Sequence, residues 1–141
     1  MSAKKIVYIA ASWKHRIAVE LLTERLERMP IEVKSFVRNA RTAEGLAALD
    51  DDNGQWINSE DGRRKFEYDL QAATTADVVI YLGPSGCDAW AEVGAAYASG
   101  RTVLGVRAKG EEVGLMRRMV QYWFITLDDL IRHVLWMWSE D

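Results

Sequence analysis

Residues 76–106 have the sequence ADVVIYLGPSGCDAWAEVGAAYASGRTVLGV, and this stretch decides the fold. The apolar runs over 77–82 and 102–106 predict buried strands, because strands covered on both faces carry few polar residues. Between them, a glycine-rich turn over 83–86 precedes an alanine-rich helix over 87–99, which ends at Gly100. A strand, a helix and a strand in this order predict a parallel sheet. Ligands bind such sheets outside the carboxyl ends of the strands.

The rest of the chain repeats this alternation. Apolar runs predict further strands over 5–10, 31–37 and 122–125, and the alternating pattern of 31–37 favours a place nearer the edge. Helices are predicted over 13–29, 61–75, 112–119 and 127–138. The inward residues of the first two are expected to be Ile17, Leu21, Leu22 and Leu26, and Phe66, Leu70 and Ala73. We therefore expect an α/β fold: one domain over 1–141, built as a Rossmann-like or flavodoxin-like three-layer sandwich with about five parallel strands and helices on both faces.

Composition excludes several classes of protein. The net charge is −3 and the basic residues are scattered, which argues against nucleic-acid binding. A single cysteine, Cys87, excludes an internal disulfide framework and a structural zinc site, and we expect neither a metal nor a cofactor. No apolar run is long enough for a secretory signal or a membrane span, so we expect a cytoplasmic protein that binds no membrane. Trp136 and Trp138 near the carboxyl end favour a contact with a partner subunit.

Three fragments converge at one edge of the expected sheet. They are Tyr8 with residues 10–13, residues 68–70, and residues 84–94. The carboxylate in the last fragment, Glu92, follows the glycine-rich turn by about a turn and a half of helix. It faces either a pocket or the solvent.

These fragments carry motifs in a fixed order. The first strand ends in a small-residue turn and a polar helix (IVYIAASWKHR), a D-L pair precedes an A-D-hydrophobic strand (DLQAATTADVVIYL), and Glu92 begins an E-[LV]-G-x-A motif that is followed by Gly100 and Arg101. From Lys5 to about Leu130 the chain resembles the nucleoside 2-deoxyribosyltransferase-like superfamily, which includes deoxynucleoside 5′-monophosphate N-glycosidases.

The resemblance implies cleavage of the N-glycosidic bond of a nucleoside or its 5′-monophosphate, with or without transfer of the deoxyribosyl group to another base. Glu92 matches the nucleophile, Asp69 the residue that orients or protonates the base, and Tyr8 the phenol beside the nucleophile. A carboxylate suits this chemistry because the sugar passes through an oxocarbenium-like state. The resemblance also implies a homo-oligomer, since family members share sites between subunits. The residues expected to bind substrate are Ser12, Trp13, Arg16, Trp56, Ser85, Gly86 and Asp88.

Structural roles for the same residues stay open. Glu92 suits a solvated helix face, Asp69 a pair with Arg63, Arg64 or Lys65, and Tyr8 a core. Either Ser85 or Asp88 suits a helix cap, and Cys87 a small buried site. The basic run 14–16 fits either a phosphate site or a solvated first turn.

Some features separate this chain from the transferases or lack an assigned role. The transferases carry an aspartate where this chain has Gly86. Residues 38–60 show no motif, and such loops are often lids or binding loops. Within them Trp56 either stacks on a base or anchors the loop. Three other functions remain as alternatives: a non-catalytic nucleotide or nucleotide-sugar sensor, an NAD-cleaving glycohydrolase, and an interaction scaffold.

Overall fold

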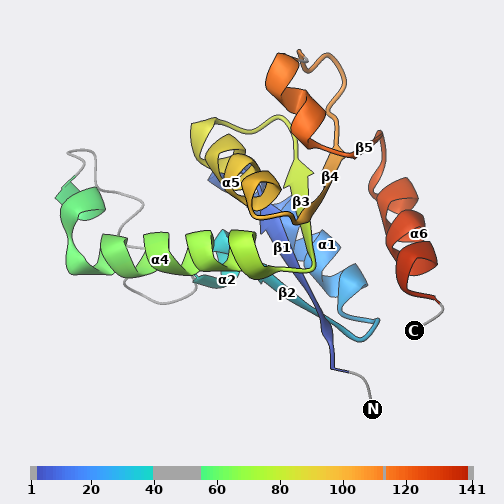
Figure 1. The fold of residues 1–141 in the computed structure, drawn as a ribbon, viewed down its shortest axis with the longest axis horizontal. Coiled ribbons are helices and arrows are strands. Elements are labelled where there is room, and N and C mark those ends of the chain that lie inside the picture. Colours follow the sequence, from blue (N-terminus) through green and yellow to red (C-terminus); the bar gives the residue numbers. More distant parts are fainter. Residues whose placement is uncertain (1–2, 40–54, 113, 140–141) are drawn as a thin grey trace.

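The computed structural model describes residues 3–39, 55–112 and 114–139. Its five strands form one parallel sheet in the order β2-β1-β3-β4-β5 (Figure 1). They are β1 (Lys5–Ala10), β2 (Ile31–Ser35), β3 (Val78–Leu82), β4 (Thr102–Val106) and β5 (Tyr122–Phe124). The predicted α/β fold with a five-stranded parallel sheet is therefore confirmed, and the carboxyl ends of β1, β3 and β4 lie side by side.

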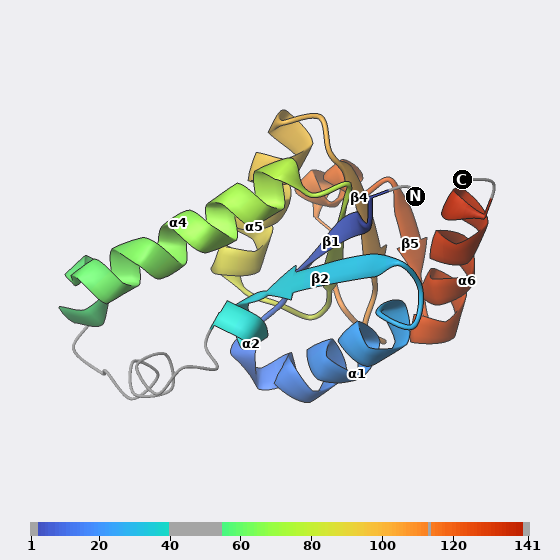
Figure 2. The same cartoon turned by 90° about the horizontal axis from the view of Figure 1, so that it is seen from below.

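Helices cover both faces of the sheet (Figure 2). One face packs against α1 (Arg16–Leu26) and α6 (Leu127–Trp138), and the other against α4 (Glu60–Thr75) and α5 (Cys87–Ala98). Because side chains alternate along a strand, Val7 and Ile9 point toward α1 and α6, whereas Tyr8 and Ala10 point toward α4 and α5. The remaining elements are α2 (Phe36–Asn39) and the 3-10 helices η1 (Trp13–His15), η2 (Gln55–Asn58) and η3 (Leu115–Met119).

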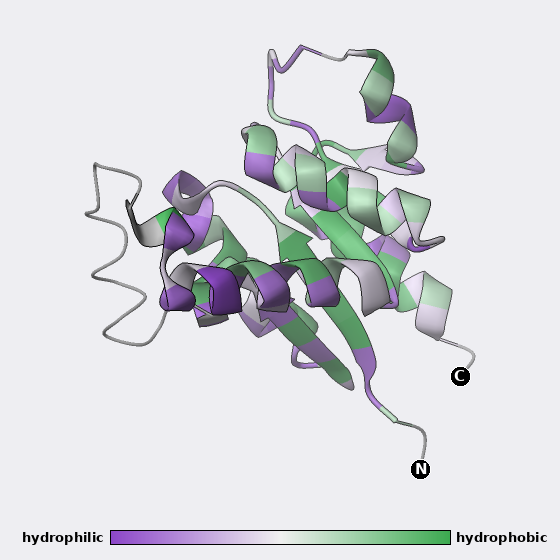
Figure 3. Cartoon of the chain, turned by 60° about the vertical axis from the view of Figure 1, so that its left-hand side comes forward, coloured by the Kyte–Doolittle hydropathy of each residue, from purple (hydrophilic) through white to green (hydrophobic). Residues whose placement is uncertain are grey.

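Two helices matter most for the site. In α5 the buried residues Ala89, Val93 and Ala96 follow a helical spacing, and Gly100 ends the element with φ +76°, as the sequence predicts. In α4 the Ser59 hydroxyl accepts a hydrogen bond from the Gly62 N–H (3.0 Å) and so caps the helix start. Figure 3 shows the hydrophobic residues gathered on the strands, whereas much of α4 is hydrophilic.

Two predicted inward faces are wrong in part. Ile17 and Leu21 are 64% and 52% exposed, because both lie on the side of α1 opposite its buried residues. The helix then turns Val19, Leu22 and Leu26 toward the sheet. On α4 Ala73 is buried as predicted, but Phe66 is 62% exposed and Leu70 is 38% exposed. The small residues Gly62 and Ala72 are buried instead.

The element boundaries largely agree with the sequence. The strands over 5–10 and 102–106 and the helix over 127–138 match their predicted ranges. The strand from Ile31 stops at Ser35, and the helix predicted over 112–119 is a 3-10 helix that begins at Leu115. Residues 40–54 of the unassigned loop lie outside the described residues. No helix in the described ranges is long and apolar enough to cross a membrane.

Candidate active site

A cleft of about 950 Å³ opens at the carboxyl edge of the sheet, between α4, α5 and the loop that follows β1. Six residues that the sequence singles out line it: Ser12, Trp13, Asp69, Gly86, Asp88 and Glu92. These residues come from three separate segments of the chain, which the adjacent strands β1 and β3 and the packed helices α4 and α5 bring together. The predicted convergence at this edge is therefore present.

Glu92 lies in the wall of this cleft, one helical turn after Asp88. Burial, followed by the negative charge of Asp69, raises the pKa of Glu92 from 4.5 to about 8, and Asp88 adds a smaller effect in the same direction. Glu92 is thus neither a solvated helix residue nor one side of an ion pair among the described residues. A carboxyl with a strongly raised pKa in a cleft is typical of acid–base and nucleophilic sites.

Tyr8 is fully buried on β1 and points toward the same pair of helices. Burial, then the charges of Glu92 and Asp69, raise the pKa of Tyr8 well above its ordinary value of 10.0, so its hydroxyl keeps its proton. The hydroxyl lies close enough to Glu92 to lower the pKa of that carboxyl, but it makes no hydrogen bond of standard geometry within the described residues. A buried hydroxyl without a partner is unusual, and here it lies beside the carboxyl that most needs a donor.

Asp69 lies on α4 and lines the cleft. The basic residues of its own helix pair with other carboxylates: Arg63 with Glu60 and Glu67 (2.9 Å to Glu67), and Lys65 with Asp61 (3.6 Å). The charge of Asp69 also acts on Glu92 and Tyr8.

Apolar side chains supply part of the cleft lining. Phe36, Ile57, Phe66 and Leu70 line it beside Trp13, whose ring lies 5.4 Å from that of Phe36. The helical spacing of Phe66 and Leu70 predicts a place in the core, because apolar residues at this spacing are typical both of a core-facing side and of a cleft-lining side of a helix. A planar, largely apolar ligand group fits this surface.

The loop over 83–86 is tied to the loop after β1. The Ser85 hydroxyl donates to the Leu82 carbonyl (2.6 Å) and accepts from the Ser12 N–H (2.9 Å), and His15 Nε2 lies 2.6 Å from the Pro84 carbonyl. Ser85 therefore neither caps α5 nor lines the cleft. His15 likewise bonds to this loop.

The other predicted binding residues have mixed outcomes. Arg16 lies over the Trp13 ring (5.8 Å) and does not line the cleft. Trp56 belongs to η2, and its side chain lies outside the described residues. Asp88 occupies the first turn of α5 without capping it. The prediction of a buried Cys87 is wrong: Cys87 is exposed and lines the cleft, whereas Ala89 is the residue of this first turn that packs in the core.

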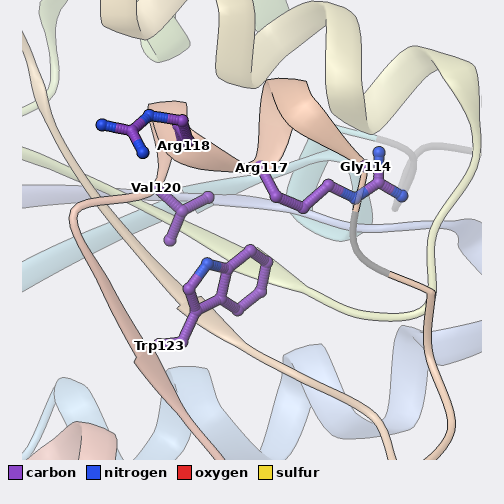
Figure 4. Close-up of a pocket in the computed structure, with 5 residues that line it drawn as sticks. All are labelled: Gly114, Arg117, Arg118, Val120 and Trp123. Carbon is purple, nitrogen blue, oxygen red and sulfur yellow. The ribbon is translucent and has the colours of Figure 1, made fainter.

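A smaller pocket of about 330 Å³ holds none of these residues (Figure 4). It lies between η3 and β5, where Arg117, Arg118 and Trp123 line it. Arg117 also stacks over Trp90, at 4.0 Å from the ring centroid. Trp90 and Glu92 are two residues apart on α5 and so point to nearly opposite sides of the helix. Within the described ranges, no group of three or more His, Cys, Asp and Glu side chains is arranged to hold a metal ion.

Comparison with solved structures identifies the fold. A 2-deoxyribosyltransferase from Bacillus psychrosaccharolyticus is 20% identical, with 89% of each chain covered and a TM-score of 0.65. A CMP N-glycosidase of Clostridium botulinum is 19% identical, with 92% of this chain and 98% of the other covered and a TM-score of 0.58. The chain shares its fold with these two enzymes.

A third structure with the same fold, a conserved protein from Enterococcus faecalis, is 14% identical, with 94% of this chain and 98% of the other covered and a TM-score of 0.67. No protein-family model and no curated protein matches the sequence. The likeness to these three structures therefore lies in the fold, and the roles of individual side chains rest on the geometry of the cleft.

Proposed function

We propose that this protein is an enzyme that cleaves the N-glycosidic bond of a nucleoside or its 5′-monophosphate, with Glu92 as the nucleophile. One observation carries the proposal: Glu92 and Asp69 line one cleft, and both carboxyls act on the ionisation of the buried Tyr8. Two enzymes that share the fold, the 2-deoxyribosyltransferase and the CMP N-glycosidase, support this class of reaction.

The proposed reaction uses the two carboxyl groups of Glu92 and Asp69 in different roles. The Glu92 carboxylate attacks C1′ of the sugar, the C1′–N bond breaks, and its electron pair leaves with the base. The departing base takes a proton, which Asp69 delivers. Water then hydrolyses the glycosyl ester, or a second base attacks C1′ and receives the sugar.

The raised pKa of Glu92 fits this sequence of steps. At neutral pH the Glu92 and Asp69 pair holds one proton, because two negative charges in one buried site repel each other. The proton that Glu92 must lose before it attacks is the one that the base must gain. The attack by Glu92 and the departure of the protonated base then leave the net charge of the cleft unchanged.

The direct test measures release of free base by chromatography from a panel of nucleosides and nucleoside 5′-monophosphates. We expect Glu92→Gln to lower base release by at least about 10³-fold. Glu20→Gln, on the exposed side of α1, is the matched control and is expected to keep wild-type activity. Full base release by Glu92→Gln would contradict the proposal. Tight binding of a nucleotide by calorimetry, without base release from any substrate, would favour a sensor instead.

The charge of the cleft bears on the choice between nucleosides and monophosphates. The carboxylates of Asp69 and Asp88 line it, and its cationic residues Arg63 and Lys65 are engaged with carboxylates of their own helix. A phosphate dianion there meets like charges. We therefore expect a higher kcat/KM for nucleosides than for the corresponding 5′-monophosphates, which the same panel measures.

We also propose that the protein is a homo-oligomer. Trp136 is 72% exposed on α6, and Ile125, just before that helix, is 81% exposed. Large apolar side chains left in water favour a contact between subunits. Size-exclusion chromatography with light scattering is expected to give a dimer or a larger assembly, and a monomer at all concentrations would contradict this part of the proposal.

A further inference from the structure

A chain of hydrogen bonds joins the loops that follow β4, β3 and β1. Its centre is Tyr81, at the end of β3, which is fully buried. The Tyr81 hydroxyl donates to the Glu111 carboxylate (2.6 Å) and accepts from the Ser85 N–H (3.0 Å). Burial, followed by this bond to Glu111, raises the pKa of Tyr81, so the hydroxyl remains a donor.

The chain continues from Ser85 to the cleft. The Ser85 hydroxyl accepts from the Ser12 N–H (2.9 Å), and the Gly86 N–H donates to the Ser12 hydroxyl (3.0 Å). Ser12 and Gly86 both line the cleft, and Gly86 directly precedes α5, the helix that carries Glu92. The position of this wall therefore depends on groups that lie outside the cleft.

Glu111 is the far end of the chain and is itself held in place. One carboxylate oxygen accepts from the Ala108 N–H (3.1 Å), and Arg107 donates to the Glu111 main-chain carbonyl (3.1 Å). The carboxylate packs directly on Gly83, where a Cβ atom would lie only 2.0 Å from Glu111 Oε1. Glycine at position 83 thus leaves the space that the carboxylate occupies.

We propose that Glu111 is a positioning residue for the active-site cleft, acting through Tyr81 and Ser85 on the wall formed by Ser12 and Gly86. The proposal rests on the proposed function, because the cleft is the one assigned above to nucleosides. Glu111 does not line the cleft, so its effect is on how substrate is held and not on the reacting atoms. Loss of its carboxylate leaves the buried Tyr81 hydroxyl without an acceptor and releases the loop over 83–86.

The test compares steady-state base release by five variants. Glu111→Ala and the nearly isosteric Tyr81→Phe are each expected to raise KM about tenfold, with kcat changed by less than about threefold. Their double variant is expected to cost no more than either alone, since both break the same chain. Glu111→Gln keeps an acceptor oxygen for Tyr81 and is expected to restore most of the wild-type KM. Glu112→Ala, at the next position, is the matched control and is expected to leave KM unchanged.

The pH profile separates positioning from chemistry. The ionisation of Glu92 near pH 8 is expected to remain in place in Tyr81→Phe, because Tyr81 is not among the groups that set the pKa of Glu92. An unchanged KM in both Glu111→Ala and Tyr81→Phe, or additive effects in the double variant, would overturn the proposal. If Glu111→Ala fails to fold, Tyr81→Phe and Glu111→Gln decide the question. If the wild-type protein releases no base at all, the proposed function fails, and calorimetric Kd values for a nucleoside replace KM in the same comparison.

Discussion

Asp69 on α4 raises the pKa of Glu92 on α5, and this relationship links the two carboxyls into one titrating pair. The two carboxyls line the same cleft, although the helices that carry them are separate in the sequence. Burial holds the proton on Glu92, and the negative charge of Asp69 reinforces that effect.

Replacement of Asp69 by asparagine removes that charge. We expect the ionisation that limits kcat/KM to move from about pH 8 to a lower value, because Glu92 then ionises more easily. We also expect kcat to fall by about 10²–10⁴-fold, since the base leaves without its proton donor. Rates of base release between pH 5 and pH 10 check both effects, with the exposed Asp129→Asn of α6 as control. An unmoved ionisation would mean that the two carboxyls do not interact.

The hydroxyl of Tyr8 acts in the opposite direction, because it lowers the pKa of Glu92. Tyr8→Phe is therefore expected to move the same ionisation above pH 8 and to lower kcat/KM at neutral pH by about tenfold. Stability should change little at neutral pH, because Glu92 there holds its own proton and the Tyr8 hydroxyl makes no hydrogen bond of standard geometry within the described residues. pH–rate profiles and thermal unfolding measure the two effects, with Tyr122→Phe on β5 as control. A destabilised variant with an unmoved profile would assign Tyr8 to the core alone.

Much of this arrangement could be predicted from the sequence. The uninterrupted apolar runs of β3 and β4 and the glycine after α5 fix a strand–helix–strand unit through local chemistry. Glu92, Asp69 and Tyr8 could be named because the motif order matches a known superfamily. The interaction between them could not be predicted, since it depends on how α4 packs against α5.

Other features depend on tertiary structure in the same way. The exposure of Phe66 and Cys87 follows from a cleft, which helical periodicity does not distinguish from a core. The bond between Tyr81 and Glu111 joins residues 30 positions apart and left no sequence signal.

The raised pKa of Glu92 also predicts how stability depends on pH. In the unfolded chain this carboxyl ionises near pH 4.5, whereas in the folded protein it stays protonated up to about pH 8. Stability from Glu92 is thus present at low pH and is lost as the pH rises from about 4.5 to about 8. Glu92→Gln cannot ionise, so it is expected to exceed the wild-type free energy of unfolding by up to about 5 kcal/mol above pH 8 and by little near pH 4. Urea unfolding at both pH values measures this, and a difference that does not change with pH would contradict the raised pKa.

Covalent catalysis by Glu92 is the central claim, and mass spectrometry tests it most directly. A nucleoside with fluorine at C2′ of the sugar slows hydrolysis of a glycosyl ester, because the fluorine destabilises the oxocarbenium-like state. After incubation with such a nucleoside, we expect the protein to gain the mass of one fluorinated sugar, and fragmentation to place it on Glu92. Glu92→Gln should gain no mass. Base release without an adduct at any time point, or an adduct located on another residue, would contradict the account.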